Sequence, residues 1–292
     1  MEDYKNAIEI KNLTKRYDGF TLDNISFSVP KGNIMGFIGQ NGAGKSTTIR
    51  AILNIIKTDS GSIKIFGKDN IADEYEIKED IAAVFDIIPF NDAFNAVRLN
   101  RMFRGIYKNW DEKTFFSYVD RFGLPRKKQI KQLSKGMKMK LQIATALSHK
   151  ARLLIMDEAT TGLDPIIRNE ILDIFREYIQ DEKNTILMSS HITGDLDKIA
   201  DGVTFIDKGK ILLSGYKDDI LASHGIVKCT VDEYKKMDKN DYISARVSDF
   251  GAEVMVSDIT RFRSKYQINI CDKADLENIM LFYVNREKKE WS

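Results

Sequence analysis

Cysteine is nearly absent from this chain, which has two in 292 residues. Cys229 and Cys271 follow neither the spacing of a metal site nor the framework of a disulfide-rich domain. Their scarcity is typical of a protein that works in a reducing interior. With 43% hydrophobic and 30% charged residues, the chain has the composition of a globular protein that can bury a sizeable core.

Long apolar runs and a strong positive charge are missing as well. No run of roughly 18 apolar residues occurs, so the sequence predicts no membrane span. Residues 1–6 are polar and charged, and no apolar signal segment follows them. The net charge is only +2, whereas binding along a phosphate backbone needs a concentrated basic face. We therefore expect no nucleic acid partner, and a role at a membrane only through another protein.

A phosphate-binding pattern is the clearest feature that is present. Residues 39–47 read Gly-Gln-Asn-Gly-Ala-Gly-Lys-Ser-Thr and fit G-x-x-x-x-G-K-[ST], between a predicted strand at 34–38 and a predicted helix at 48–56. The glycines let backbone N–H groups turn toward an anion at the helix N-terminus. Lys45 is expected to reach the β- and γ-phosphates, and Ser46 to hold Mg²⁺. The nucleotide site predicted from this loop comprises Gly39, Asn41, Gly42, Ala43, Gly44, Lys45, Ser46 and Thr47.

Acidic residues follow a second predicted strand, at 153–156. In a parallel sheet, Asp157 and Glu158 would lie in the crevice at the carboxyl ends of the strands, where such sheets bind ligands. Asp157 can share the Mg²⁺ with Ser46, while Glu158 is free to orient or deprotonate a water. His191 follows another predicted strand, at 185–189, and could contact a γ-phosphate, although such a histidine is more often structural.

Three further stretches supply candidate ligand contacts. Ser134 can cap a helix at its start, and Gly136 permits a ligand to approach the first turn, so this helix start could hold a second phosphate. Asp164 is a predicted N-cap, with Pro165 at the first helical position. Tyr17, just upstream of the loop, could stack on adenine or belong to the core.

The order of these segments predicts an α/β fold: a P-loop NTPase core with an N-terminal antiparallel β-subdomain, an inserted helical subdomain and a small C-terminal α/β extension. We expect a nucleotide-binding domain at 1–225, its helical subdomain at about 89–148, and an accessory domain at 226–292. Strands are predicted there at 226–231, 242–247, 252–256 and 267–270, with a closing helix after residue 272. The accessory domain would serve dimer contact or regulation, or be a packing appendage.

Together the segments resemble the nucleotide-binding subunit of ATP-binding cassette (ABC) transporters over residues 5–225. The P-loop matches 39–47, the signature sequence 133–136, and the metal-holding strand 153–157. In the matching positions the resemblance implies an adenine-stacking aromatic, a catalytic glutamate, an inter-subunit aspartate and a switch histidine. These positions are Tyr17, Glu158, Asp164 and His191.

The resemblance also implies a mechanism and partners. Two cassettes, as a homodimer or heterodimer, would bind ATP and Mg²⁺ between the P-loop of one and the signature of the other. Ser134, Gly136 and Asp164 would thus act across the interface, while Glu158 orients water and Lys45 and His191 stabilise phosphoryl charge. Hydrolysis would drive export through separate transmembrane permease subunits, with the cassettes held at the cytoplasmic face of the plasma membrane.

Two positions depart from the family pattern. Asp86 stands where glutamine is usual after the strand at 81–85; that glutamine touches Mg²⁺, and a shorter anionic side chain would touch it through water. The signature reads Ser-Lys-Gly-Met instead of Ser-Gly-Gly-Gln, which places Lys135 and Met137 beside the ligand-binding residues. Both variants resemble a bacterial subgroup of export-type cassettes.

A soluble ABC-type ATPase that acts on ribosomes or chromosomes is the alternative. The ribosomal branch normally carries two cassettes in one chain, and only one P-loop is present here. Chromosomal relatives insert a long coiled coil between P-loop and signature, whereas the stretch from 45 to 134 is short and lacks sustained heptads. A cassette used only as an ATP-binding switch is disfavoured by Glu158. These features favour the transporter.

Overall fold

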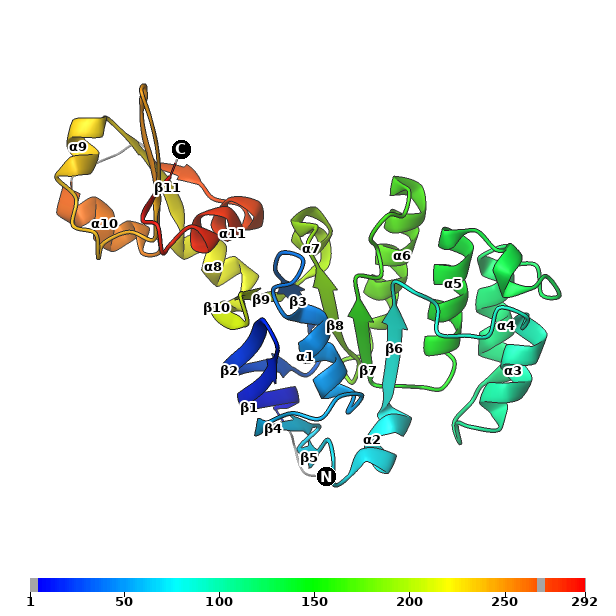
Figure 1. Cartoon of the computed structure of the whole chain (residues 1–292). Coiled ribbons are helices and arrows are strands. Elements are labelled where there is room, and N and C mark those ends of the chain that lie inside the picture. Colours follow the sequence, from blue (N-terminus) through cyan, green and yellow to red (C-terminus); the bar gives the residue numbers. More distant parts are fainter. Residues whose placement is uncertain (1–4, 267–270, 292) are drawn as a thin grey trace.

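The computed structural model describes residues 5–266 and 271–291. Its centre is a six-stranded sheet with strand order β10-β9-β3-β8-β7-β6 (Figure 1). All neighbours pair in parallel except β10, which is antiparallel to β9. The strands are β3 Ile34–Ile38, β6 Ile81–Phe85, β7 Leu153–Asp157, β8 Thr185–Ser190, β9 Gly202–Asp207 and β10 Lys210–Tyr216.

The parallel register brings the predicted site residues together at the carboxyl ends of the strands. Phe85 pairs with Asp157, and Asp157 pairs with Ser189. The loops that follow β3, β6, β7 and β8 therefore leave the sheet side by side. The P-loop, the acidic pair Asp157–Glu158 and His191 therefore lie next to one another at these strand ends.

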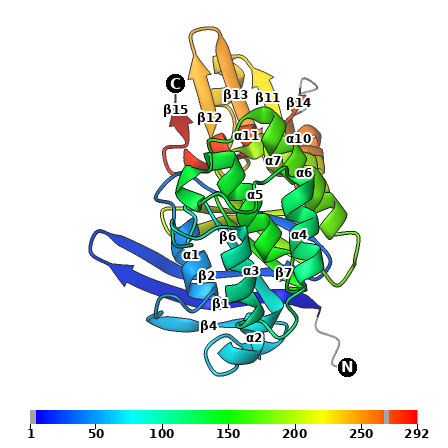
Figure 2. The ribbon, with the colours of Figure 1, turned by 90° about the vertical axis from the view of Figure 1, so that its right-hand side faces the viewer.

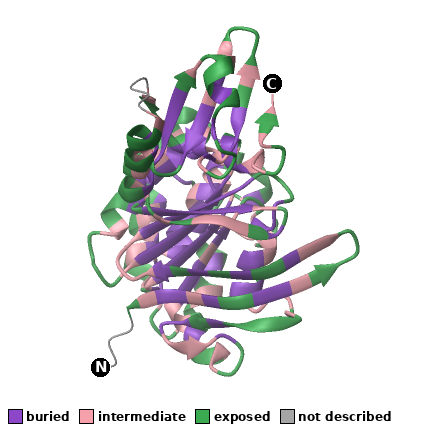
Figure 3. Ribbon diagram, turned by 90° about the vertical axis from the view of Figure 1, so that its left-hand side faces the viewer, coloured by how far each residue is buried: buried purple, intermediate pink, exposed green. Residues whose placement is uncertain are grey.

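Strands β3, β7 and β8 are buried on both faces, and their alternate residues enter two different cores. Leu153 and Ile155 pack toward helix α1 (Lys45–Ile52) and an antiparallel sheet, whereas Leu154 and Met156 pack toward a layer of helices. Figure 3 shows the buried residues concentrated in these central layers. The sheet is thus a rigid partition between two apolar layers, which fixes the strand ends that carry the site.

The N-terminal layer is an antiparallel sheet with order β2-β1-β4-β5, together with α1 and α2. The hairpin turns at Gly19, whose φ of 78° suits glycine. Helix α1 begins at Lys45, directly after Gly44, and so starts earlier than predicted. It ends at Ile52, also earlier than predicted, because Asn54 turns to a φ of 52°. The elements are β1 Asn6–Tyr17, β2 Phe20–Pro30, α1 Lys45–Ile52, β4 Ser60–Ile65, β5 Lys68–Asp69 and α2 Glu74–Asp80.

Helices cover the opposite face of the central sheet (Figure 2). Helix α5 packs against β6 and α4, and Phe115 and Val119 of α4 are fully buried in the shared core. This layer consists of α3 Ala96–Arg104, α4 Glu112–Arg121, η1 Ile130–Gln132, α5 Lys135–Ala146, α6 Pro165–Tyr178 and α7 Thr193–Ile199.

A third sheet, order β14-β11-β13-β12-β15, is formed by the C-terminal residues. One face has its own core around Tyr234, Val254 and Phe262, whereas Ile279 and Phe282 of α11 join the core of the helical layer, and α11 packs against α7. The elements are α8 Lys217–Ser223, β11 Gly225–Cys229, α9 Val231–Lys235, β12 Ala245–Ser248, β13 Gly251–Val256, α10 Ile259–Tyr266, β14 Cys271–Lys273, α11 Leu276–Val284 and β15 Glu290–Trp291.

The fold-class prediction is confirmed: an α/β core carries an antiparallel sheet on one side and helices on the other. The predicted strand at 267–270 lies outside the described residues. Helices α8, α9 and α10 are not predicted by the sequence analysis. The strand predicted at 226–231 ends at Cys229, because α9 begins at Val231 with Thr230 as its N-cap. Within the described ranges, no helix combines the length and the apolarity that crossing a bilayer requires.

Candidate functional site

The phosphate-binding loop connects β3 to α1, as predicted. Gly42 and Gly44 have φ angles of 81° and 116°, which other residues rarely adopt. Gly39 is needed for a different reason, since a Cβ there would lie 2.4 Å from the carbonyl oxygen of Ile206. Asn41 is exposed at the tip of the loop, next to Gly42. The loop therefore packs closely on β9 and leaves its tip accessible.

Lys45 reaches back into this loop. Its side chain is only 5% exposed, and Nζ donates to the carbonyl oxygens of Gly39, at 2.7 Å, and Gln40, at 3.2 Å. The same ammonium lies 3.0 Å from Oε1 of Glu158. The P-loop lysine and the acidic strand end thus form one connected unit.

Asp157 and Ser46 meet beside this lysine. The Ser46 hydroxyl donates to Oδ1 of Asp157 at 3.1 Å, and Asp157 is 8% exposed at the end of β7. Ser189, which the sequence analysis does not identify, donates to the same oxygen at 2.8 Å. Ser189 is found only once β7 and β8 are known to be neighbours, because it lies opposite Asp157 in the sheet.

This oxygen-rich corner fits a magnesium ion that is also bound by a nucleotide. Mg²⁺ is held in such sites by one or two protein oxygens together with phosphate oxygens, and Ser46 and Asp157 supply a hydroxyl and a carboxylate. Within residues 5–266 and 271–291, no cluster of three or more His, Cys, Asp or Glu side chains could hold a metal by itself. The donor set therefore suits Mg²⁺ with a triphosphate.

Glu158 is held by three side chains. Its φ is 54°, an uncommon value that is often found at functional positions, and its carboxylate accepts from Thr161 at 2.8 Å. His191 Nδ1 lies 2.7 Å from Oε2, and Lys45 contacts Oε1. Burial acts to raise the pKa of Glu158, but the hydrogen bonds from Thr161, Lys45 and His191 outweigh it and lower this pKa.

This geometry corrects one detail of the sequence analysis. Glu158 is expected there to be free to orient a water, yet in the structure Lys45 and His191 occupy its two oxygens. The reason is electrostatic: Lys45 at the start of α1 and His191 just after β8 face the same carboxylate, which accepts hydrogen bonds strongly. In this geometry neither carboxylate oxygen of Glu158 is free of a partner, and its action on water stays a prediction.

Tyr17 lies at the exposed end of β1 and is not a core residue. Its side chain is 45% exposed, and the Lys15 ammonium lies 5.3 Å from the centre of its ring. An accessible ring at the tip of a hairpin can stack on a base. The interpretation of Tyr17 as a core residue is therefore wrong, and its stacking on adenine stays a prediction.

Ser134, Gly136 and Asp164 form a second group, at the starts of α5 and α6. Ser134 accepts from the N–H of Met137 at 3.3 Å, and Asp164 accepts from the N–H groups of Ile166 and Ile167 at 3.1 and 3.0 Å. Both predicted N-caps are confirmed. A Cβ on Gly136 would lie 2.5 Å from Cδ1 of Ile167, so this glycine lets the two helix starts pack together, whatever ligand approaches it.

Asp86 contacts both the acidic strand end at Asp157 and the start of α5. Its backbone N–H donates to the carbonyl oxygen of Asp157 at 3.0 Å, and its carboxylate lies 2.6 Å from Nζ of Lys135, the first residue of α5. The Gln142 amide of the same helix bonds both backbone groups of Phe85. The sequence analysis identifies Asp86 and Lys135 as separate departures and does not predict that they pair.

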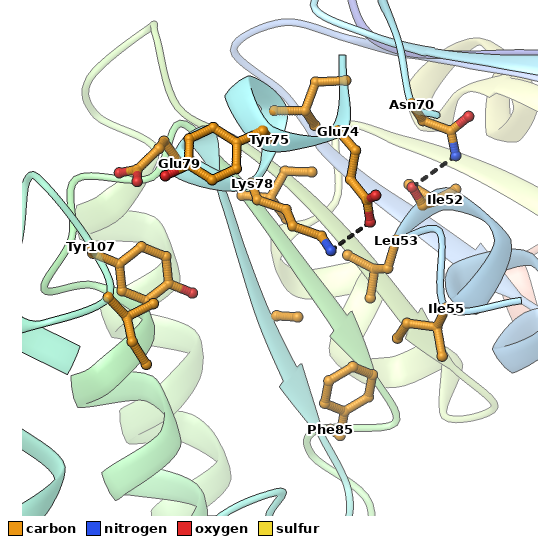
Figure 4. A pocket seen from close by; sticks show the side chains of 14 residues that line it. Ile52, Leu53, Ile55, Asn70, Glu74, Tyr75, Lys78, Glu79, Phe85 and Tyr107 are labelled. Atoms are coloured by element: carbon orange, nitrogen blue, oxygen red, sulfur yellow. Dashed lines mark hydrogen bonds and ion pairs between the residues drawn. The ribbon is translucent and has the colours of Figure 1, made fainter. Parts of the chain in front are cut away.

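A groove opens beside Phe85 (Figure 4). It has a volume of about 380 Å³ and lies between α2, the end of α1 and the segment after α3. Three of its lining residues, Ile55, Tyr75 and Ile106, are 59%, 76% and 58% exposed. The groove is therefore an apolar surface one residue away from Asp86.

Comparisons with known proteins agree with this geometry. Residues 22–161 match the family model described as ABC transporter. The bacitracin transport ATP-binding protein BcrA of Bacillus licheniformis is 36% identical over 211 residues, which are 70% of this chain and 68% of BcrA. The daunorubicin/doxorubicin resistance ATP-binding protein DrrA of Streptomyces peucetius is 32% identical over 226 residues, 75% of this chain and 68% of DrrA.

Solved structures agree as well. The structure titled "Structure of ATP binding subunit of ABC transporter" superposes with a TM-score of 0.66 at 26% identity and covers 74% of this chain and 92% of that one. CbiO1 of Clostridium perfringens, part of the transporter complex cbiONQ, superposes with a TM-score of 0.63, also at 26% identity, over 75% and 92% of the two chains. The chain therefore belongs to the ABC transporter family as an ATP-binding subunit, and it is an ATPase.

Proposed function

We propose that this subunit dimerises around two ATP–Mg²⁺ and drives export through separate membrane subunits. The observation that carries the proposal is the division of the site. Lys45 contacts Glu158, and Ser46 contacts Asp157. In contrast, Ser134 and Asp164 cap helix starts elsewhere on the same chain. Two copies placed head to tail would combine both groups around each nucleotide.

Each residue then has a defined task. Lys45 would leave Glu158 for the β- and γ-phosphates, which frees Glu158 to orient the attacking water. His191 would stabilise phosphoryl charge, and Ser46 and Asp157 would hold Mg²⁺, which neutralises charge on the phosphate oxygens when bound. Tyr17 would stack on adenine, and Asp86 would lie beside the nucleotide. From the partner, Ser134, Gly136 and Asp164 would close the site.

The names of similar proteins support the proposal that the transport is export. BcrA is named for bacitracin transport and DrrA for daunorubicin/doxorubicin resistance, and a lantibiotic transport ATP-binding protein, SrtF of Streptococcus pyogenes, is 34% identical over 212 residues. We infer a substrate of this kind, a compound expelled from the cell, and membrane subunits that hold the protein at the cytoplasmic face of the plasma membrane.

Mixing two inactive variants tests the shared site. Lys45→Ala removes the P-loop half, and Ser134→Ala the opposite half, so each homodimer should be inactive. A heterodimer of the two retains one intact pocket, and random mixing should restore about a quarter of wild-type ATP turnover. If each variant hydrolyses ATP at full speed as a proven monomer, the proposal is wrong.

The apolar groove is the proposed docking place of a membrane subunit. Tyr75 and Ile106 expose apolar surface there, and a short amphipathic segment could bury it. Tyr75→Glu with Ile106→Asp should abolish co-purification of the membrane subunits while ATP binding persists. Phe250→Asp is the matched control, because Phe250 is fully exposed and lies far along the chain in the β12–β13 hairpin. Equal loss in the control would contradict docking at the groove.

A further inference from the structure

The end of strand β1 is held by an aspartate from another part of the chain. Oδ2 of Asp59 accepts from the backbone N–H of Arg16 at 2.6 Å, and its Oδ1 accepts from Nζ of Lys15 at 3.5 Å. The backbone N–H of Asp59 donates to the carbonyl oxygen of Thr14 at 2.9 Å. One residue therefore bonds each of the three residues that directly precede Tyr17.

Strand pairing delivers Asp59 to this place. Asp59 directly precedes β4, which is antiparallel to β1, and Thr14 pairs with Ser60 after a shift of register. Gly61 has a φ of 94°, and a Cβ there would lie 2.5 Å from the carbonyl oxygen of Asn12, so a glycine lets the two strands approach this closely. The bonds of Asp59 to β1 are thus supported by packed backbone and do not depend on a free loop.

The Lys15 ammonium is shared between Asp59 and the ring of Tyr17. Besides its contact with Asp59, Nζ lies over this ring, 5.3 Å from the ring centre, which is the geometry of a cation–π contact. Lys15 covers one face of the ring, so a base would stack on the other face, and Tyr17 keeps 45% of its surface exposed. We call Tyr17 with the Lys15 side chain over its ring the stacking platform.

The stacking platform lies next to the phosphate-binding loop. Tyr17 pairs with Phe20 across the β1–β2 hairpin, and a Cβ on Gly44 would lie 3.1 Å from Cζ of Phe20. Gly44 directly precedes Lys45, the first residue of α1. Movement of the end of β1 would therefore change the position of the Tyr17 ring relative to the triphosphate site.

We propose that Asp59 is a positioning residue for the nucleotide base: it holds the end of β1 so that the stacking platform is formed before ATP arrives. The proposal rests on the stacking of adenine on Tyr17, which is part of the proposed function. A ring at the end of an exposed hairpin loses conformational freedom when a base stacks on it, and this loss weakens binding. The bonds of Asp59 restrict the backbone beforehand, so less freedom is lost when ATP binds.

Titration with two magnesium complexes separates the base from the phosphates. ATP carries a base, whereas inorganic tripolyphosphate offers three linked phosphates without one, and calorimetry measures both affinities. Asp59→Ala should weaken ATP binding about three- to tenfold and leave the affinity for tripolyphosphate within about twofold of the wild type. Asp59→Asn keeps an acceptor for the N–H of Arg16 and should bind both ligands within about twofold of the wild type.

A double-mutant cycle shows whether Asp59 acts through Tyr17. Tyr17→Ala removes the ring and should weaken ATP binding about 5- to 100-fold, the range expected from loss of base stacking. Adding Asp59→Ala to Tyr17→Ala should weaken it no further, because no ring is left to position. Asp69→Ala is the matched control and should bind ATP like the wild type. Asp69, in β5 of the same sheet, also accepts from backbone N–H groups, those of Ile71 and Ala72.

The proposal is overturned if Asp59→Ala binds ATP like the wild type, or if it loses as much affinity for tripolyphosphate as for ATP. It is also overturned if Asp59→Asn or Asp69→Ala weakens ATP binding as much as Asp59→Ala does, or if the losses add in the double variant. Wild-type ATP affinity in Tyr17→Ala would leave Asp59 no ring to position and would overturn it as well. Failure of the proposed nucleotide site has a different signature, because Lys45→Ala would then bind both ATP and tripolyphosphate like the wild type.

Discussion

The P-loop side of the chain and its signature side are built on different principles. On the P-loop side, contacts join three neighbouring segments: Lys45 pairs with Glu158 after β7, and Asp157 at the end of β7 accepts from Ser46 of α1 and Ser189 of β8. On the signature side, Ser134 and Asp164 satisfy only the first backbone N–H groups of their own helices. The first group is preorganised by the central sheet, and the second is held by local capping. The difference teaches that the contacts of the P-loop side can be tested within a single chain, whereas the proposed role of the signature side can be tested only with a second copy present.

The largest effect is expected on the P-loop side, when the proposed general base is removed. Glu158→Gln keeps the shape of the side chain but cannot accept a proton from water, so ATP turnover should fall about 10²–10⁴-fold. ATP binding should persist, because Lys45 remains. Steady-state ATPase assays and nucleotide titration measure the two quantities. Glu182→Gln, at an exposed position, is the control, and unchanged turnover in Glu158→Gln would remove this residue from the base role.

Lys45→Ala should act on binding instead of on turnover alone. The ammonium would make charge-assisted hydrogen bonds to phosphate, and loss of one to two such bonds weakens affinity about 10- to 100-fold. Titration with a fluorescent ATP analogue measures the change. Lys57→Ala, exposed just beyond α1, should bind like the wild type. Wild-type affinity in Lys45→Ala would refute the P-loop assignment.

Ser134 separates local capping from action on a partner. Ser134→Ala should lower the free energy of unfolding by about 1 kcal/mol through loss of the N-cap, whereas Ser134→Asn restores a cap and this stability. Both should lose turnover if the hydroxyl acts across a dimer interface. Asp111→Ala is the matched control, because Asp111 caps α4 in the same way, accepting from Thr114. If ATP turnover falls only in proportion to the loss of stability in all three variants, Ser134 acts only as a helix cap.

The smallest effect concerns acid stability. Burial opposes ionisation of Glu158, but its hydrogen bonds from Thr161 and Lys45 lower its pKa below the ordinary value of 4.5. A lowered pKa contributes stability that is present above pH 4.5 and is lost as the pH falls through the lower, folded value. Urea unfolding between pH 6 and pH 3 should therefore show a shallower decline for Glu158→Gln than for the wild type. Parallel declines would show that Glu158 contributes nothing.

Much of the P-loop side is predictable because its signals are local. The pattern 39–47 names the loop, and the apolar run before Asp157 identifies a buried strand that delivers the acidic pair. Both N-caps, Ser134 and Asp164, are also local, since a cap bonds N–H groups within three residues of itself. The structure confirms each of these features.

The missed features depend on which strands and helices become neighbours. Ser189 reaches Asp157 only because β8 lies beside β7, and the pair of Asp86 with Lys135 requires α5 to pack on β6. Likewise the need for a glycine at position 136 depends on Ile167 of α6.

The sequence by itself determined the phosphate loop, the α/β class and the helix starts, because spacing of a few residues controls turns, caps and strand periodicity. Only the tertiary structure decided that Lys45 holds Glu158 and that Asp86 holds Lys135. Ion pairs between distant segments form where packing of the sheet and helices brings opposite charges within a few ångströms, and no local pattern records that distance.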